Sequence, residues 1–129
     1  MASFKNRIKK ISSDKSPLIL ANDYESSTAD IESRTIKNIK TLSPYLCAIK
    51  FNFHLLLPLG KKQITRINKI AHDHNLQTIA DIKLNDIGNT NDVTAQTLWN
   101  LGFDAVIVDR KSTRLNSSHI QKSRMPSSA

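Results

Sequence analysis

Short runs rich in β-branched and apolar residues alternate with longer stretches of helical periodicity along most of this 129-residue chain. The short runs cover residues 18–22, 46–51, 77–82 and 105–108, and the helical stretches between them cover residues 29–42, 61–74 and 91–101. This alternation is typical of parallel βα units. Before the first run, Phe4, Ile8 and Ile11 share one face of a short amphipathic helix that could cap the end of a domain.

Two architectures fit repeated βα units with such short connections, a doubly wound sheet and a (β/α)8 barrel. The phosphate fingerprint of the first is missing, because none of the three glycines, Gly60, Gly88 and Gly102, belongs to a G-x-G-x-x-G or P-loop pattern. Four units are half of a barrel, which typically needs about 250 residues. We therefore expect residues 1–108 to form one α/β domain, the N-terminal half of a (β/α)8 barrel.

Charged residues gather where three neighbouring predicted strands end. Asp23 follows the first strand, Lys50 lies near the end of the second, and Asp81 and Lys83 end the third, with Asp86 in the loop after it. In parallel α/β folds the carboxyl ends of the strands meet at one edge, where the chemistry gathers. Adjacent strands lie about 4.8 Å apart, so Lys50 is predicted within reach of the third strand's charges.

This cluster of ammonium and carboxylate groups has two interpretations. It could be an ion-pair network that only ties strand ends together, since structural networks also hold shifted pKa values. Catalysis is the other interpretation, because burying charges on an apolar strand costs several kcal/mol unless they are fully paired. A lysine between carboxylates is also held protonated, ready to act as a general acid.

The motif D-x-K-x-x-D, formed by Asp81, Lys83 and Asp86, resembles the shared motif of the orotidine monophosphate decarboxylase superfamily. Its continuation IGNT at residues 87–90 is similar to the decarboxylase form of the loop, and LILAND at residues 18–23 is similar to the family's first strand. The resemblance covers roughly residues 17–108. It implies a lyase that converts orotidine 5'-phosphate to uridine 5'-phosphate in pyrimidine synthesis, without a metal or an organic cofactor.

The resemblance also implies roles for individual residues. Lys83 would protonate C6 of the pyrimidine as carbon dioxide leaves, and Asp81 would lie against the substrate carboxylate. Lys50 would link Asp81 to the ribose, which Asp23 would bind. Asp86 would be a further catalytic residue, and Ile87, Asn89 and Thr90 would bind the substrate. Asp86 and Thr90 would reach into the active site of the other subunit of a homodimer.

Residues 109–129 break the pattern with a run rich in Ser, Arg and Lys. One interpretation is a disordered basic tail. However, DRKSTRLNSSH and KSRMPSSA within it match, without a gap, the translation of a widely used sequencing-library adapter. We therefore expect a non-native tail after a gene interrupted in its fourth strand, and a chain that is inactive as written. Adapter-unlike codons in the coding DNA would contradict this.

Net charge leaves a non-enzymatic alternative open. The chain carries +8, but residues 1–108 hold 14 basic and 10 acidic side chains, so half of the excess lies in the tail. A small basic nucleic-acid-binding domain is therefore less favoured than an enzyme that acts on a small-molecule substrate. A phosphosugar decarboxylase or aldolase of the same superfamily is a further alternative, disfavoured by Lys50, where those relatives tend to carry a carboxylate.

Other features point to an ordinary cytoplasmic protein. No apolar run is long enough to span a membrane, no secretory signal is present, and Cys47 has no second cysteine to pair with. The residues His54, His72 and His74 lack metal-ligand spacing and are predicted at the surface. The basic series of residues 61–69 is predicted to be the solvated face of its helix.

Overall fold

The computed structural model describes the backbone of residues 2–84 and 89–109 and the side chains of residues 2–83 and 92–109. The described elements are α1 (Phe4–Asp14), β1 (Ile19–Asn22), α2 (Ile31–Leu42), the 3-10 helix η1 (Ser43–Tyr45), β2 (Ala48–Asn52), α3 (Phe53–Leu56), α4 (Lys61–Asp73), β3 (Gln77–Leu84), α5 (Asn89–Asn100) and β4 (Ala105–Val108). The four strands form one parallel sheet in the order β1-β2-β3-β4. The predicted α/β class and all four predicted strands are confirmed.

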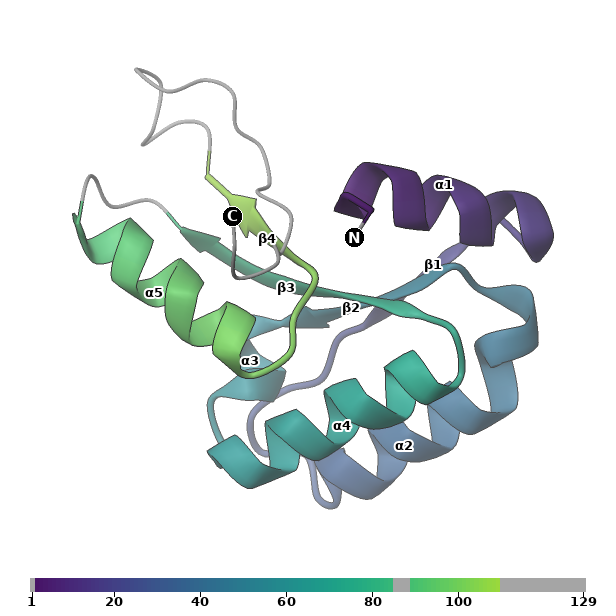
Figure 1. The fold of residues 1–129 in the computed structure, drawn as a ribbon. Helices are drawn as coiled ribbons and strands as arrows, with labels where there is room; N and C mark the ends of the chain where they lie inside the picture. Colours follow the sequence, from purple (N-terminus) through teal and green to yellow (C-terminus); the bar gives the residue numbers. More distant parts are fainter. Residues whose placement is uncertain (1, 85–88, 110–129) are drawn as a thin grey trace.

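The sheet separates two apolar layers. Successive side chains of a strand point to opposite faces, so Ile49 and Phe51 of β2 pack against α2 and α4, whereas Ala48 packs toward α1. Figure 1 shows α2 and α4 side by side against one face, α5 farther along the same face, and α1 on the opposite side. The helices α2 and α4 bury the apolar stripes that their periodicity predicted, including Ile39 and Ile67, whereas Val93 of α5 is 56% exposed.

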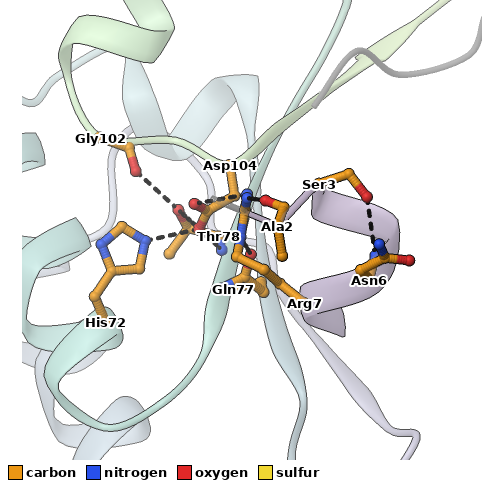
Figure 2. A network of polar contacts seen from close by, with 9 residues as sticks. All are labelled: Ala2, Ser3, Asn6, Arg7, His72, Gln77, Thr78, Gly102 and Asp104. Atoms are coloured by element: carbon orange, nitrogen blue, oxygen red, sulfur yellow. Dashed lines mark hydrogen bonds and ion pairs between the residues drawn. The ribbon is translucent and has the colours of Figure 1, made fainter. Parts of the chain in front are cut away.

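The helix α1 is fastened to the sheet by a buried carboxylate. Asp104, directly before β4, lies 3.5 Å from the Arg7 guanidinium of α1 and 2.7 Å from Nε2 of His72 in α4. The same carboxylate accepts the main-chain N–H of Thr78 at 2.8 Å, and Arg7 Nε donates to Gln77 at 2.7 Å. Figure 2 shows these side chains converging from α1, α4, β3 and the residues before β4. The predicted capping helix is therefore present, and polar contacts as well as Phe4, Ile8 and Ile11 hold it.

Three local features differ from the sequence expectations. Two short helices, η1 and α3, were not predicted, because each has too few residues to show a period. His72 is not a plain surface residue, since Asp104 binds its ring and its side chain is only 31% exposed. The second strand begins at Ala48 rather than at residue 46, a difference of the usual size at strand ends.

None of the helices in the described part of the chain is long and apolar enough to cross a bilayer.

Candidate functional site

The charged residues predicted at the strand ends come from three adjacent strands. Lys50 of β2 pairs in register with Ala21 of β1 and Ile79 of β3. Asp81 lies two residues beyond Ile79 on β3, where it pairs in register with Asn52. Lys50 and Asp81 project from the sheet face that α1 covers lower down, because they alternate with the residues packed against α2 and α4. Parallel pairing thus brings these charges to one edge of the sheet.

These residues form a continuous chain of alternating charges. Lys50 Nζ lies 3.1 Å from Oδ1 of Asp23 and 3.0 Å from Oδ2 of Asp81. The other oxygen of Asp81, Oδ1, accepts a hydrogen bond from Lys83 Nζ at 2.8 Å. Two carboxylates and two ammonium groups therefore neutralise each other, and each of the inner two groups has two partners.

Burial is graded along this chain of charges. The Asp81 side chain is 9% exposed and that of Lys50 is 21% exposed, whereas those of Asp23 and Lys83 are 48% and 67% exposed. The inner pair, Lys50 and Asp81, is therefore largely shielded from water, whereas the Asp23 carboxylate and the Lys83 ammonium group are exposed to water. The Lys83 ammonium group binds Asp81 on one side and is exposed on the other, so it can still contact a ligand.

The two inner groups are held in their charged forms. Burial alone would raise the pKa of Asp81, but hydrogen bonds from Lys83 and Lys50 and their positive charges outweigh it and hold this pKa below its ordinary 3.8. Burial likewise would lower the pKa of Lys50, but the hydrogen bonds and charges of Asp81 and Asp23 raise it above 10.5. Both groups are therefore ionised near neutral pH.

Lys83 has an unusual backbone conformation. Its φ is +50°, in the left-handed region that residues with a Cβ rarely adopt, and the pairing of β3 with β4 is irregular between Ala80 and Leu84. Strain of this kind clusters at functional sites. Residues two apart on an extended strand point to the same side. The side chains of Asp81 and Lys83 do meet, although the backbone at Lys83 is not extended.

Four of the predicted site residues lie outside the described side chains. Asp86 and Ile87 fall within residues 85–88, which the structure does not describe, and Asn89 and Thr90 contribute only backbone, at the start of α5. Their predicted roles in substrate binding therefore stay predictions.

One residue beside the site was missed from the sequence. Asn52, the last residue of β2, binds three main-chain groups with its side-chain amide: Tyr24 N–H, Tyr24 C=O and Leu55 N–H. The signal for it was an asparagine at a strand end directly before an apolar run, which suits the N-cap of a helix.

Other candidates do not form a second site. Within the described residues, no group of three or more His, Cys, Asp or Glu side chains is placed to hold a metal ion. Cys47 is buried in the core. The four basic side chains of α4 are exposed as predicted, and two of them, Arg66 and Lys69, are paired with carboxylates.

Known proteins resemble this chain over the same region. The family model described as "Orotidine 5'-phosphate decarboxylase / HUMPS family" matches residues 16–110. An orotidine 5'-phosphate decarboxylase of Thermococcus kodakarensis is 35% identical over 94 residues, which are 73% of this chain and 40% of that protein. The Pyrococcus horikoshii enzyme of the same name is 37% identical over 75 residues, 58% of this chain and 35% of its own length.

Solved structures agree on the fold. The crystal structure of the Pyrococcus horikoshii enzyme matches with a TM-score of 0.55 and 33% identity, over 70% of this chain and 40% of that one. A Streptomyces avermitilis structure matches with a TM-score of 0.66 over 88% of this chain and 47% of its own, and at 18% identity it supports the fold alone. The predicted partial (β/α)8 barrel is thereby confirmed. The chain spans less than half the length of these relatives, and it belongs to the orotidine 5'-phosphate decarboxylase / HUMPS family.

Proposed function

We propose that this chain carries part of the active site of an enzyme that decarboxylates orotidine 5'-phosphate to uridine 5'-phosphate. The observation that carries the proposal is the buried Asp81 carboxylate held between the ammonium groups of Lys50 and Lys83, at 3.0 and 2.8 Å. Fixed charges of this kind need no reorganisation when charge develops in a transition state.

In the proposed reaction, the bond between C6 of the pyrimidine and the carboxylate carbon breaks, and carbon dioxide leaves. The bonding electron pair stays on C6, to which the Lys83 ammonium donates a proton; solvent then reprotonates Lys83. Asp81 lies against the substrate carboxylate and keeps both lysines charged and in place. Lys50 connects Asp81 to the ribose, where Asp23 binds a hydroxyl group. These four groups supply charge and proton, so the mechanism requires no metal or organic cofactor from the rest of the protein.

The remaining roles extend the proposal to the whole protein. Asp86 and Thr90 would enter the active site of a second subunit in a homodimer, with Ile87 and Asn89 completing the substrate contacts. A cytoplasmic location suits an enzyme of nucleotide synthesis. Residues 109–129 would be translated adapter sequence without a role of their own.

The test is an assay of the uninterrupted gene, recovered from the source DNA, in which the absorbance of orotidine 5'-phosphate is followed over time. We expect turnover by the parent enzyme and a loss of at least about a hundredfold for Lys83→Ala, the usual scale of a general acid. Lys10→Ala is the matched control, because that lysine is exposed on α1 and its one ion-pair partner among the described residues is Asp14. Circular dichroism checks that each variant folds.

Other outcomes would contradict the proposal. An uninterrupted enzyme that ignores orotidine 5'-phosphate but acts on a hexulose phosphate would assign it to the other branch of the family. Full activity of Lys83→Ala would remove the proposed acid. The 129-residue chain by itself is expected to show no measurable turnover, because the resemblance places the pyrimidine and phosphate loops beyond the matched residues.

A further inference from the structure

The Asp23 carboxylate is weakly held by its own contacts. It lies one residue beyond β1, its side chain is 48% exposed, and within the described residues its one ion-pair partner is Lys50 at 3.1 Å. Half-exposed ion pairs contribute little energy and fix little geometry. If Asp23 is to bind a ribose hydroxyl in a defined position, its backbone must be fixed by other groups.

The side chain of Asn52 fixes the residue after Asp23. Its Oδ1 accepts the main-chain N–H of Tyr24 at 3.2 Å, and its Nδ2 donates to the Tyr24 carbonyl at 3.1 Å. The same Oδ1 accepts the N–H of Leu55 at 3.2 Å and so caps α3. The ladder between β1 and β2 ends at the pair Asn22 and Phe51, and this amide continues it beyond the last backbone pair.

The residue before Asp23 is fixed as well. Asn22 is 3% exposed; its Nδ2 donates to Thr35 Oγ1 at 2.9 Å, and its Oδ1 accepts from Asn38 Nδ2 at 2.8 Å. Asn38 also donates to the Tyr24 hydroxyl at 3.1 Å. Asp23 is therefore the one exposed residue between two immobilised neighbours.

Only an amide of this length meets the three contacts. An aspartate would keep both acceptor bonds but lose the donor, and it would turn a carboxylate toward the Tyr24 carbonyl. It would also add a negative charge opposite Asp81, which pairs with Asn52 in register. Alanine would lose all three bonds.

We propose that Asn52 is a positioning residue that sets the place of the Asp23 carboxylate over the substrate through both main-chain groups of Tyr24. This inference rests on the proposed function and assigns a role to a residue outside the chain of charges formed by Asp23, Lys50, Asp81 and Lys83. Asp23 would contact the ribose equally in the ground state and in the transition state. Loss of its positioning should therefore weaken binding rather than slow the chemical step.

The experiment measures kcat and KM for orotidine 5'-phosphate in the uninterrupted enzyme. For Asn52→Ala we expect KM to rise about tenfold while kcat changes by less than about threefold. The matched control is Gln63→Ala, which removes a side-chain bond to the Gly60 N–H, at 2.9 Å, in the first turn of α4. That variant should keep the parent KM.

A double-mutant cycle separates positioning from a general structural role. If Asn52 acts through Asp23, then Asn52→Ala in an Asp23→Ala background should raise KM by less than about twofold, because coupled residues are not additive. An unchanged KM for Asn52→Ala, or a rise that is fully additive with Asp23→Ala, would overturn the inference. Absence of turnover in the parent enzyme would instead be a failure of the proposed function.

Asn52→Asp keeps the inference testable if Asn52→Ala does not fold. This variant retains the α3 cap and the bond from Tyr24 N–H, so its fold should survive, as a thermal melt would show. We expect KM of Asn52→Asp to rise less than the tenfold expected for Asn52→Ala, and this rise should again not be additive with that of Asp23→Ala. A KM equal to that of the parent would contradict the positioning role.

Discussion

At the scale of single residues, Asp81 is the centre of the site because it is the least exposed of the site's four charged groups and has two ammonium partners. Its meeting with Lys50 and Lys83 was predictable, since strand spacing and the alternation of side chains are local rules. The left-handed φ of Lys83 was not, because lysine has no special preference for that conformation. Nor was the Asn52 bridge, which depends on how the end of β1 meets the start of α3.

The lowered pKa of Asp81 predicts an acid-dependent loss of stability. A carboxyl group whose pKa is depressed on folding stabilises the fold fully above its ordinary value, here 3.8, and loses that contribution as the pH falls through its lower folded value. Asp81→Asn should therefore be less stable than the parent at about pH 7, and the difference should shrink toward about pH 3. Urea unfolding of both chains at several pH values measures this.

The control for this pH experiment is Asp14→Asn, which removes an exposed pair with Lys10. Such a pair contributes little at any pH, so this variant should unfold like the parent throughout. A constant difference between Asp81→Asn and the parent at all pH values would show that the ionisation of Asp81 does not stabilise the fold.

Lys50 contributes to stability in a different pH range. Because its pKa is raised on folding, the charged lysine stabilises the fold fully below its ordinary value of 10.5, and this contribution is lost as the pH rises through the higher folded value.

Gly102 is a second residue whose identity is required by its position in the fold. It lies two residues after the end of α5 and adopts φ +104°. A Cβ at this position would lie 3.0 Å from the Cβ of Asn68, whose amide donates to the Leu101 carbonyl. Gly102→Ala should therefore lower the free energy of unfolding by about 1–3 kcal/mol.

Gly60→Ala is the matched control in the same denaturant experiment. Gly60 has a negative φ, and the nearest atom to an added Cβ is a flexible glutamine oxygen at 3.7 Å. In Gly60→Ala, the lower conformational entropy of the unfolded chain stabilises the fold, and the loss of a favourable N-cap residue destabilises it. These two effects should nearly cancel. Equal effects at both glycines would show that the backbone strain inferred at Gly102 is absent.

At the scale of elements, the periodic stretches were predictable because helices such as α2 and α4 and the inner strand β2 bury their own apolar patterns. The attachment of α1 was predictable only in its apolar half, through Phe4, Ile8 and Ile11. The polar half joins Arg7, His72 and Asp104, which are far apart in the chain, and no local pattern connects them.

Asp104→Ala should therefore destabilise the fold more than an ordinary surface change. Removal of this carboxylate, which is 6% exposed, leaves Arg7, the His72 ring and the Thr78 N–H without their common partner (Figure 2). Loss of one member of a buried pair costs about 3–5 kcal/mol. The free energy of unfolding from denaturant titration measures this, with Asp73→Ala, at an exposed pair with Lys69, as control. A loss as small as that of the control would contradict the anchoring role.

At the scale of the whole molecule, the described sheet has two edges, β1 and β4, and neither strand carries the residues that usually protect an edge. Edge strands of natural proteins usually carry charges, prolines or bulges that prevent pairing with another chain. The strand sequences ILAN and AVIV have no charge and no proline, and Leu18 and Ile19 are 60% and 48% exposed at the β1 edge. The 129-residue chain is therefore expected to associate through these edges as its concentration rises.

Sedimentation velocity over a range of concentrations tests this expectation with two lysine substitutions of equal charge. Leu18→Lys places a charge directly before the β1 edge and should shift the chain toward the monomer, because lysine disfavours strand pairing. Leu57→Lys replaces a leucine of similar exposure, 57%, at the end of α3, a helix that contacts the inner strands β2 and β3, and should leave the association unchanged. If the two variants reduce association equally, added charge and not the strand edge is responsible. A parent chain that stays monomeric at every concentration would show that the edges are covered, and residues 110–129 would then be the segment to remove next.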